Sequence, residues 1–223
     1  MKKVWYEDDF SGDHKVLICG MGSSDIIPGK FEWANLWTGK YNDLKFKKMR
    51  LGDHNISWYH TRFPGIKGYG PFALAKFMKR KIRKANVEKT MLMGVSMGGY
   101  GAIMLGCILG VDEVIAFSPQ TWLTEFRYKK AKLHKKFEGF DIDERITDLK
   151  NVLEKYDTGK TTYHIYYGKL NGGDTAHAKN ISHIKNVVLH PVNSRIHTVA
   201  RELVKDGTVG EAMKKFTESV YQE

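Results

Sequence analysis

A serine flanked by glycines lies where an apolar strand pattern changes into the pattern of a helix built from small residues. Residues 94–99 read GVSMGG, after a short apolar run at 89–93 and before apolar residues at helical spacing in 100–109. A sharp strand-to-helix turn presents a serine hydroxyl clear of the backbone, where a neighbouring base can activate it. Such a turn leaves no room for side chains beside the serine, which accounts for Gly94 and Gly98. The pattern therefore predicts a nucleophile elbow with Ser96 as the nucleophile.

The same stretch is also compatible with a glycine-rich turn of a Rossmann-like domain, which holds a phosphate at a helix N-terminus. The lysine of a phosphate-binding P-loop and the G-x-G-x-x-G order are both missing at this position. Their absence favours the nucleophile over the phosphate site.

Strand patterns alternate with helical patterns along most of the chain. Helices are expected from Pro71 to about Asn86 and over 143–156, 175–185, 196–205 and 210–221. The expected strands cover residues 3–6, 15–19, 46–51, 90–94, 114–117, 163–167 and 187–189. This order predicts an α/β fold with a mainly parallel sheet and helices on both faces.

The length of 223 residues suits one α/β domain over residues 1–223. The longest stretch between two expected strands is 119–160, which we expect to be a small lid or surface insertion before the acid-bearing strand. We expect neither a signal peptide nor a membrane span, because acidic residues follow the first apolar residues and no apolar run is long enough. Cys19 and Cys107 lie in apolar segments, which predicts reduced core thiols and a cytoplasmic protein.

The chain is basic, with a formal net charge of +11. The excess cations are concentrated in residues 45–50, 76–89 and 127–136. Several of these belong to solvated helix faces, but a net charge this positive also favours an anionic ligand or polymer on the basic surface.

A serine nucleophile needs a histidine base and an acid that orients it. Asp174 follows the expected strand 163–167, and His197 follows the expected strand 187–189, at the start of an expected helix. Both positions lie at the edge of an open α/β sheet where functional groups gather. Ser96, Asp174 and His197 are therefore the predicted catalytic residues.

Other residues compete for these roles. His190 is the main rival of His197 as the base, because it too lies near a strand end. His177, three residues after Asp174, could bond that acid without being the base, and His183 is expected at a helix surface. Asp148 and Asp157 rank below Asp174 because they belong to the insertion or its helix. Three histidines that precede or lie within expected strands are expected to be structural: His54, His60 and His164.

An oxyanion hole requires two backbone N–H groups aimed at the developing negative charge. The amide of Met97 is the first candidate. The second should come from the glycine-rich residues 20–24, where we select Met21 over an ordinary turn that has no catalytic part. Gly22, Gln120 and Trp122 are expected to contact the substrate, the last two because they follow the strand after the elbow.

Further aromatic residues could line a pocket, although packing in the core is the commoner fate of such side chains. They are Trp33, Trp37, Trp58 and Tyr59. Nothing in the sequence has metal-ligand spacing, and we expect no cofactor.

With the elbow and this order of elements, residues 15–207 resemble the α/β-hydrolase superfamily. The resemblance implies that Ser96 attacks an acyl carbonyl, His197 takes and returns the proton, and Asp174 holds the imidazolium. Residues 57–60, 117–120 and 174–178 are also similar to uncharacterised bacterial hydrolases associated with surface-glycan genes. The absence of an HGGG-type loop argues against a lipase-like groove for a large hydrophobic ester.

Three functions follow as hypotheses. The first is a serine esterase acting on a small-molecule or glycan-linked ester, and the second is an acyltransferase that uses the same three residues. The third is a hydrolase fold without chemistry that binds an anionic polymer.

Overall fold

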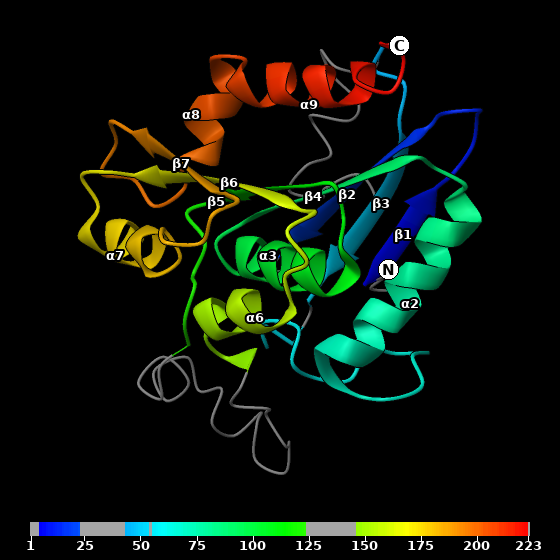
Figure 1. Cartoon of the computed structure of the whole chain (residues 1–223), viewed down its shortest axis with the longest axis horizontal. Coiled ribbons are helices and arrows are strands. Elements are labelled where there is room, and N and C mark those ends of the chain that lie inside the picture. Colours follow the sequence, from blue (N-terminus) through cyan, green and yellow to red (C-terminus); the bar gives the residue numbers. More distant parts are fainter. Residues whose placement is uncertain (1–4, 23–42, 54, 124–145, 223) are drawn as a thin grey trace.

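Seven strands form one sheet in the order β1-β3-β2-β4-β5-β6-β7 (Figure 1). The computed structural model describes residues 5–22, 43–53, 55–123 and 146–222. Strand β1 pairs antiparallel with β3, and every other pairing is parallel. The strands are β1 (Tyr6–Asp9), β2 (Val16–Gly22), β3 (Lys47–Gly52), β4 (Lys89–Val95), β5 (Glu113–Phe117), β6 (Thr162–Gly168) and β7 (Val187–Val192). The predicted α/β architecture with a mainly parallel sheet is confirmed.

The central strands are buried on both faces, because helices cover the sheet from two sides. All seven residues of β2 are buried, as are all residues of β4 and β5 except the first of each. Strands of this kind read as continuous apolar runs rather than alternating patterns. This is why they could be located from the sequence.

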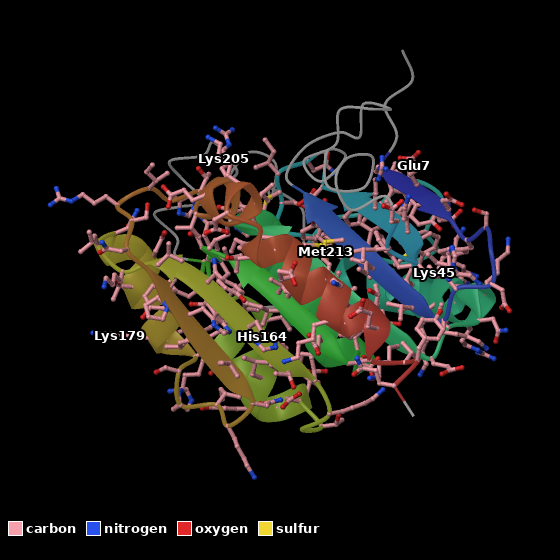
Figure 2. All side chains as sticks on the ribbon, turned by 90° about the horizontal axis from the view of Figure 1, so that it is seen from above. Glu7, Lys45, His164, Lys179, Lys205 and Met213 are labelled. Carbon is pink, nitrogen blue, oxygen red and sulfur yellow. The ribbon has the colours of Figure 1, made fainter. Side chains whose placement is uncertain are left out.

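Helices α2 (Gly70–Ala85), α3 (Met97–Leu109), α6 (Leu149–Tyr156) and α7 (Gly172–Asn180) lie on one side of the sheet in Figure 1. Helices α8 (Ala200–Lys205) and α9 (Thr208–Glu218) lie on the other side. Figure 2 looks onto that second side, where α9 crosses the sheet and the buried Met213 faces it. The sheet therefore separates two apolar cores that share its strands.

Most boundaries differ from the predicted ones by a few residues, and three of these differences affect the edge of the sheet or the segments that carry Asp174 and His197. Strand β1 is Tyr6–Asp9, paired along Leu51–Lys48, rather than 3–6, of which residues 3 and 4 lie outside the described residues. The strand was difficult to predict because three of its four residues are acidic. Charged residues are common on edge strands, where they oppose aggregation. Helix α7 begins at Gly172 rather than Thr175, because the Asn171 side chain accepts hydrogen bonds from the first turn. Helix α8 begins at Ala200 rather than Ile196.

The described parts of segment 119–160 pack against the body of the fold. Trp122 forms a β-bridge with Asp148, and α6 buries Leu149, Val152 and Leu153 toward α3. Residues 124–145, on which the expectation of a lid depends, lie outside the described residues. So does the basic cluster 127–136.

No helix within the described parts of the chain is long and apolar enough to cross a membrane.

Candidate active site

Ser96 lies in a tight turn between β4 and α3. Its backbone has φ 52° and ψ −112°, although it is not a glycine, and its N–H donates to the carbonyl of Phe117 on β5 (2.8 Å). A non-glycine residue with positive φ is strained and persists only where the surrounding structure fixes it. The turn has the local geometry of the predicted elbow.

The glycines beside Ser96 are required by close backbone approach. A β-carbon on Gly94 would overlap the backbone of Gly98, and one on Gly98 would overlap the carbonyl of Met21 on β2. One turn further on, a β-carbon on Gly101 would overlap the ring of Tyr59. The small residues thus let α3 begin directly against β2 and β4.

Ser96, His197 and Asp174 form a continuous chain of hydrogen bonds, which we call the Ser–His–Asp chain. The Nε2 atom of His197 lies 2.8 Å from Ser96 Oγ, and its Nδ1 atom lies 2.6 Å from Asp174 Oδ1. The Asp174 side chain is 4% exposed, whereas that of His197 is 42% exposed. A buried carboxylate, an imidazole open on one side and a half-buried hydroxyl are the groups that serine-based acyl transfer uses in this order.

Local structure explains how two of these residues reach the site. Asp174 lies in the first turn of α7, where Asn171 caps the helix and accepts from the N–H of Asp174 (3.2 Å). His197 lies in the loop between β7 and α8, and Ser194 holds this loop by accepting from the N–H of Ile196 (3.1 Å). The predicted helical position of His197 is therefore wrong, because the Ser194 turn delays the helix start.

The two oxygens of the Asp174 carboxylate have different surroundings. Oδ2 is buried and has no hydrogen-bond partner among the residues that the structure describes, while Oδ1 faces His197. The partner group that satisfies this carboxylate within the described residues is thus the imidazole. Because a buried carboxylate is costly when it is not paired, this contact also holds the imidazole in place.

The rival base His190 is engaged elsewhere. Its Nε2 atom lies 3.0 Å from Nδ1 of His164, and its ring stacks on Tyr166 with centroids 4.3 Å apart. Burial lowers the pKa of both histidines below the ordinary value near 6.5. In Figure 2, His164 lies on β6 beside the area that α9 covers.

His177 serves the fold and does not bond Asp174. Its Nδ1 atom accepts from the backbone N–H of Thr121 (3.1 Å), and the Thr121 hydroxyl donates to the His177 carbonyl (2.8 Å). The Trp122 ring packs on the imidazole with centroids 3.8 Å apart. His177 therefore ties the segment after β5 to α7.

The remaining rivals also have structural partners. Asp148 caps α6, and Asp157 accepts from the hydroxyl of Tyr163 (3.0 Å). His60 Nε2 lies 2.9 Å from the Tyr100 hydroxyl, and His183 pairs with Glu154 at the surface. His54 lies outside the described residues.

The two predicted oxyanion donors, Met97 and Met21, lie in different kinds of secondary structure. Met97 is the first residue of α3, where helical N–H groups have no carbonyl within the helix to bond. Met21 is paired with Gly94 inside the sheet, and its carbonyl faces Gly98. The loop after Gly22 lies outside the described residues, so the second donor stays a prediction.

Of the predicted substrate contacts, Gln120 and Gly22 are held by one loop. Trp58 donates its indole N–H to Gln120 Oε1 (2.7 Å), and the next residue, Tyr59, donates its hydroxyl to the Gly22 carbonyl (2.7 Å). Tyr59 is a core residue, as its type suggested, and Trp58 is buried as well. Trp33 and Trp37 lie outside the described residues.

Asp53, which the sequence analysis missed, organises that loop. Its buried carboxylate accepts from the N–H groups of Asn55, Ser57 and Tyr59 at 2.7 to 3.2 Å. Burial raises the pKa of Asp53, and these hydrogen bonds oppose the rise. An aspartate just after a strand, followed four residues later by a serine, was the available signal.

Among the described residues, no group of three or more acidic, histidine or cysteine side chains could hold a metal ion.

No protein-family model matches the chain, and a search of curated proteins finds no relative. Solved structures do match. The capsule O-acetyltransferase of Neisseria meningitidis serogroup A is 16% identical, with a TM-score of 0.67 over 92% of this chain and 89% of that one. A carboxylesterase structure from Nitrososphaera gargenis is 14% identical, with a TM-score of 0.64 over 95% and 94%.

A third match names the fold. An α/β-hydrolase enzyme from the metagenome of lagoon sediments at Mar Chica, Morocco, is 14% identical, with a TM-score of 0.62 over 94% of each chain. The chain therefore has the α/β-hydrolase fold, as its sequence predicts.

Proposed function

We propose that this protein is a serine hydrolase that cleaves a carboxylic ester through an acyl-enzyme intermediate. The observation that carries the proposal is the Ser–His–Asp chain, with 2.8 Å between His197 Nε2 and Ser96 Oγ and 2.6 Å between His197 Nδ1 and Asp174 Oδ1. Its three members come from separate segments of the chain and meet at one edge of the sheet. The strained turn at Ser96 supports the same role, because such strain clusters at functional sites.

In the first half-reaction, Ser96 Oγ attacks the ester carbonyl carbon while its proton passes to His197 Nε2. The carbonyl π electrons move onto the oxygen, which becomes an oxyanion. When the tetrahedral intermediate collapses, the C–O bond to the alcohol breaks, and the alcohol leaves with the proton from His197. Asp174 stabilises the imidazolium between these two transfers.

In the second half-reaction, water attacks the acyl-enzyme. His197 accepts the water proton, a second oxyanion forms, and its collapse returns the proton to Ser96 Oγ and releases the carboxylic acid. The exposed side of the His197 ring supports this step, because water must approach the imidazole.

The oxyanion would be stabilised by the Met97 N–H and, in our proposal, by that of Met21. Loss of one such donor costs about 3 kcal/mol of transition-state stabilisation. Gly22, Gln120 and Trp122 would contact the substrate, a small-molecule or glycan-linked ester. The Trp58–Gln120 hydrogen bond supports a preformed wall at this place.

Acyl transfer is the alternative on the same three residues, with a sugar hydroxyl replacing water in the second half-reaction. The structural similarity to a capsule O-acetyltransferase favours considering it. Product analysis separates the two: hydrolysis gives the free acid at any acceptor concentration, whereas transfer gives a new ester that increases with added sugar.

Turnover of p-nitrophenyl acetate tests the proposed nucleophile. We expect Ser96→Ala to lower kcat by about 10⁴-fold or more, with an unchanged circular dichroism spectrum. Ser182→Ala, at an exposed serine whose hydroxyl donates to the Lys179 carbonyl in its own turn, is the matched control and should leave kcat unchanged. Activity that survives Ser96→Ala would refute the mechanism.

We also propose a cytoplasmic location. The support is that Cys19 and Cys107 are both free and buried, so that neither forms a disulfide.

A further inference from the structure

Helix α2 carries a row of cations on its exposed face. Its sixteen residues include six lysines and arginines and no acid. Five of the six are exposed and recur every three or four residues, so they lie on one side of the helix. We call them the α2 basic stripe: Lys76, Lys79, Arg80, Arg83 and Lys84.

The cations of the stripe are not neutralised within the described part of the chain. The sixth cation of the helix, Lys81, pairs with Asp8 of β1 (3.0 Å), whereas none of the five forms an ion pair with a described residue. Like charges three and four residues apart destabilise a helix. An anionic chain bound along the stripe would relieve this repulsion. An ordinary solvated helix face carries charges of both signs and needs no such partner.

The other basic cluster that the structure describes does not offer such a surface. In residues 45–50, Lys47 is buried and donates to the Ala85 carbonyl (2.7 Å), and Arg50 pairs with Glu7 (3.1 Å). The cluster 127–136 lies outside the described residues. Among the basic clusters that the structure describes, the α2 basic stripe is therefore the one that offers a surface for an anionic ligand.

The stripe extends from Lys76 to the end of α2, and the first residue of this helix lies near the edge of the sheet that holds Ser96. Helix α2 begins at Gly70, next to the carbonyl of His60, and the His60 ring bonds Tyr100 in the first turn of α3. It ends at Ala85, bonded to the first residue of β3. Helix α2 therefore runs antiparallel to the parallel strands, from their carboxyl edge to their amino edge (Figure 1). The exposed Arg62 and Lys67 lie in the segment between His60 and Gly70.

A groove at the far end of the stripe supports an anionic ligand. It has a volume of about 260 Å³ and is lined by Lys79 and Arg83, among others. The acids of its wall are already paired, Asp112 with Lys160 (3.4 Å) and Glu88 with Lys15 (3.3 Å). The positive charge of Lys79 and Arg83 in the groove is therefore not cancelled by these acids.

We propose that the α2 basic stripe binds an acidic polysaccharide and directs it toward Ser96, so that the ester substrate is carried on an anionic glycan. That the substrate is an ester on an anionic glycan rests on the proposed function, because sugar hydroxyls carry esters of the kind that Ser96 would attack. A polysaccharide fits better than a single-stranded nucleic acid, since no exposed aromatic ring on which a base could stack lies within residues 76–84. The exposed ring of α2, Phe72, precedes Lys76 by one turn and packs against Tyr156.

Binding of labelled polygalacturonate tests the stripe without any chemistry, in full-length protein carrying Ser96→Ala. The stripe variant combines Lys76→Gln, Lys79→Gln and Arg83→Gln. The matched control removes the same charge from α8 and α9, on the opposite side of the sheet, with Arg201→Gln, Lys205→Gln and Lys214→Gln. We expect the stripe variant to bind at least about tenfold more weakly and to lose salt dependence, while the control stays within about twofold.

Three results would overturn the proposal. They are unchanged binding by the stripe variant, an equal loss in the control, and stripe-dependent binding of a single-stranded DNA of equal charge that is tighter than that of polygalacturonate.

The same variants with Ser96 restored separate the stripe from the chemistry. Hydrolysis of p-nitrophenyl acetate should be unchanged, whereas KM for acetylated polygalacturonate should rise about tenfold at constant kcat. An unchanged KM for that polymer would contradict the proposal that the ester substrate is carried on an anionic glycan. Absence of all esterase activity in the unmodified protein would refute the proposed function, while the binding experiment would still decide whether the stripe holds a glycan.

Discussion

Ser96 combines a backbone that few residues adopt with a side chain that two other residues hold in line. Positive φ at a serine costs about 1–3 kcal/mol, which the sheet on one side and α3 on the other must supply. This conformation places the Ser96 hydroxyl beside the imidazole of His197, whose Nδ1 atom is held by the buried Asp174 carboxylate. Each of these three contributions can be tested at a single position.

Asp174→Asn tests the carboxylate. The amide keeps the size of the side chain but removes the negative charge that stabilises the imidazolium, so we expect kcat for p-nitrophenyl acetate to fall about 10³- to 10⁴-fold. Asp157→Asn, at an aspartate that bonds Tyr163 instead, is the control and should leave kcat near that of the unmodified protein. A loss below about tenfold at Asp174 would contradict its role.

Gly98→Ala tests the elbow itself. The added methyl would overlap the Met21 carbonyl, and neither backbone can move without disturbing the sheet. We expect the free energy of unfolding to fall by about 3 kcal/mol or more, measured with urea. Gly172→Ala, where a β-carbon meets nothing within 4 Å, should change it by less than about 1 kcal/mol. Equal effects at the two positions would rule out a steric requirement for the turn.

At the scale of elements, the sequence was sufficient to predict those strands and helices whose position follows from the pattern of apolar side chains. The apolar runs that became β2, β4 and β5 are buried on both faces, so composition was sufficient to locate them. The start of α7 depends on the Asn171 cap, and the position of His197 depends on the Ser194 turn. Such side chain–backbone bonds are local, but their effect on an element boundary is hard to see in a sequence.

The loop that carries Trp58 was harder to predict. Ile56, Trp58 and Tyr59 all have positive φ, which nothing in their residue types suggests. Three backbone N–H groups converge on Asp53, and this single buried carboxylate holds the conformation. A cluster of this kind is visible only once the chain is folded.

Strands β6 and β7 carry a prediction about pH, through the His164–His190 pair. Burial lowers the pKa of both imidazoles below 6.5, so the unfolded chain takes up protons first as the pH falls. Stability should therefore be complete above that value and decrease below it. Lys215 also lowers the pKa of His164, while burial raises that of the nearby Glu113 and gives an opposite trend above its usual value near 4.5.

Urea unfolding from about pH 8 to about pH 5.5 measures this dependence. The double variant His164→Gln with His190→Gln should lose less stability over that range than the unmodified protein. A steeper loss in the variant would show that the pair does not titrate as described.

At the scale of the whole molecule, the sheet joins two cores that face opposite sets of helices. Leu74 of α2 belongs to one core and Met213 of α9 to the other, and both side chains are fully buried. Because β2, β4 and β5 contribute to both cores, we expect residues 1–223 to behave as the single domain that the sequence predicts. The order of elements along the chain was sufficient to predict this architecture, whereas a lid in segment 119–160 stays a prediction.

Large-to-small substitutions test this coupling. Leu74→Ala and Met213→Ala should each lower the free energy of unfolding by about 2–5 kcal/mol. Circular dichroism and tryptophan fluorescence should report one coincident transition in both variants. Two separate transitions in either variant would mean that the two faces fold independently.

Labelling with a fluorophosphonate probe, followed by mass spectrometry of the modified peptide, tests the proposed nucleophile and base together. We expect a single adduct on Ser96 that forms in the unmodified protein and in His190→Ala, but not in His197→Ala. Labelling at another residue, or labelling that depends on His190, would contradict the roles proposed for Ser96 and His197.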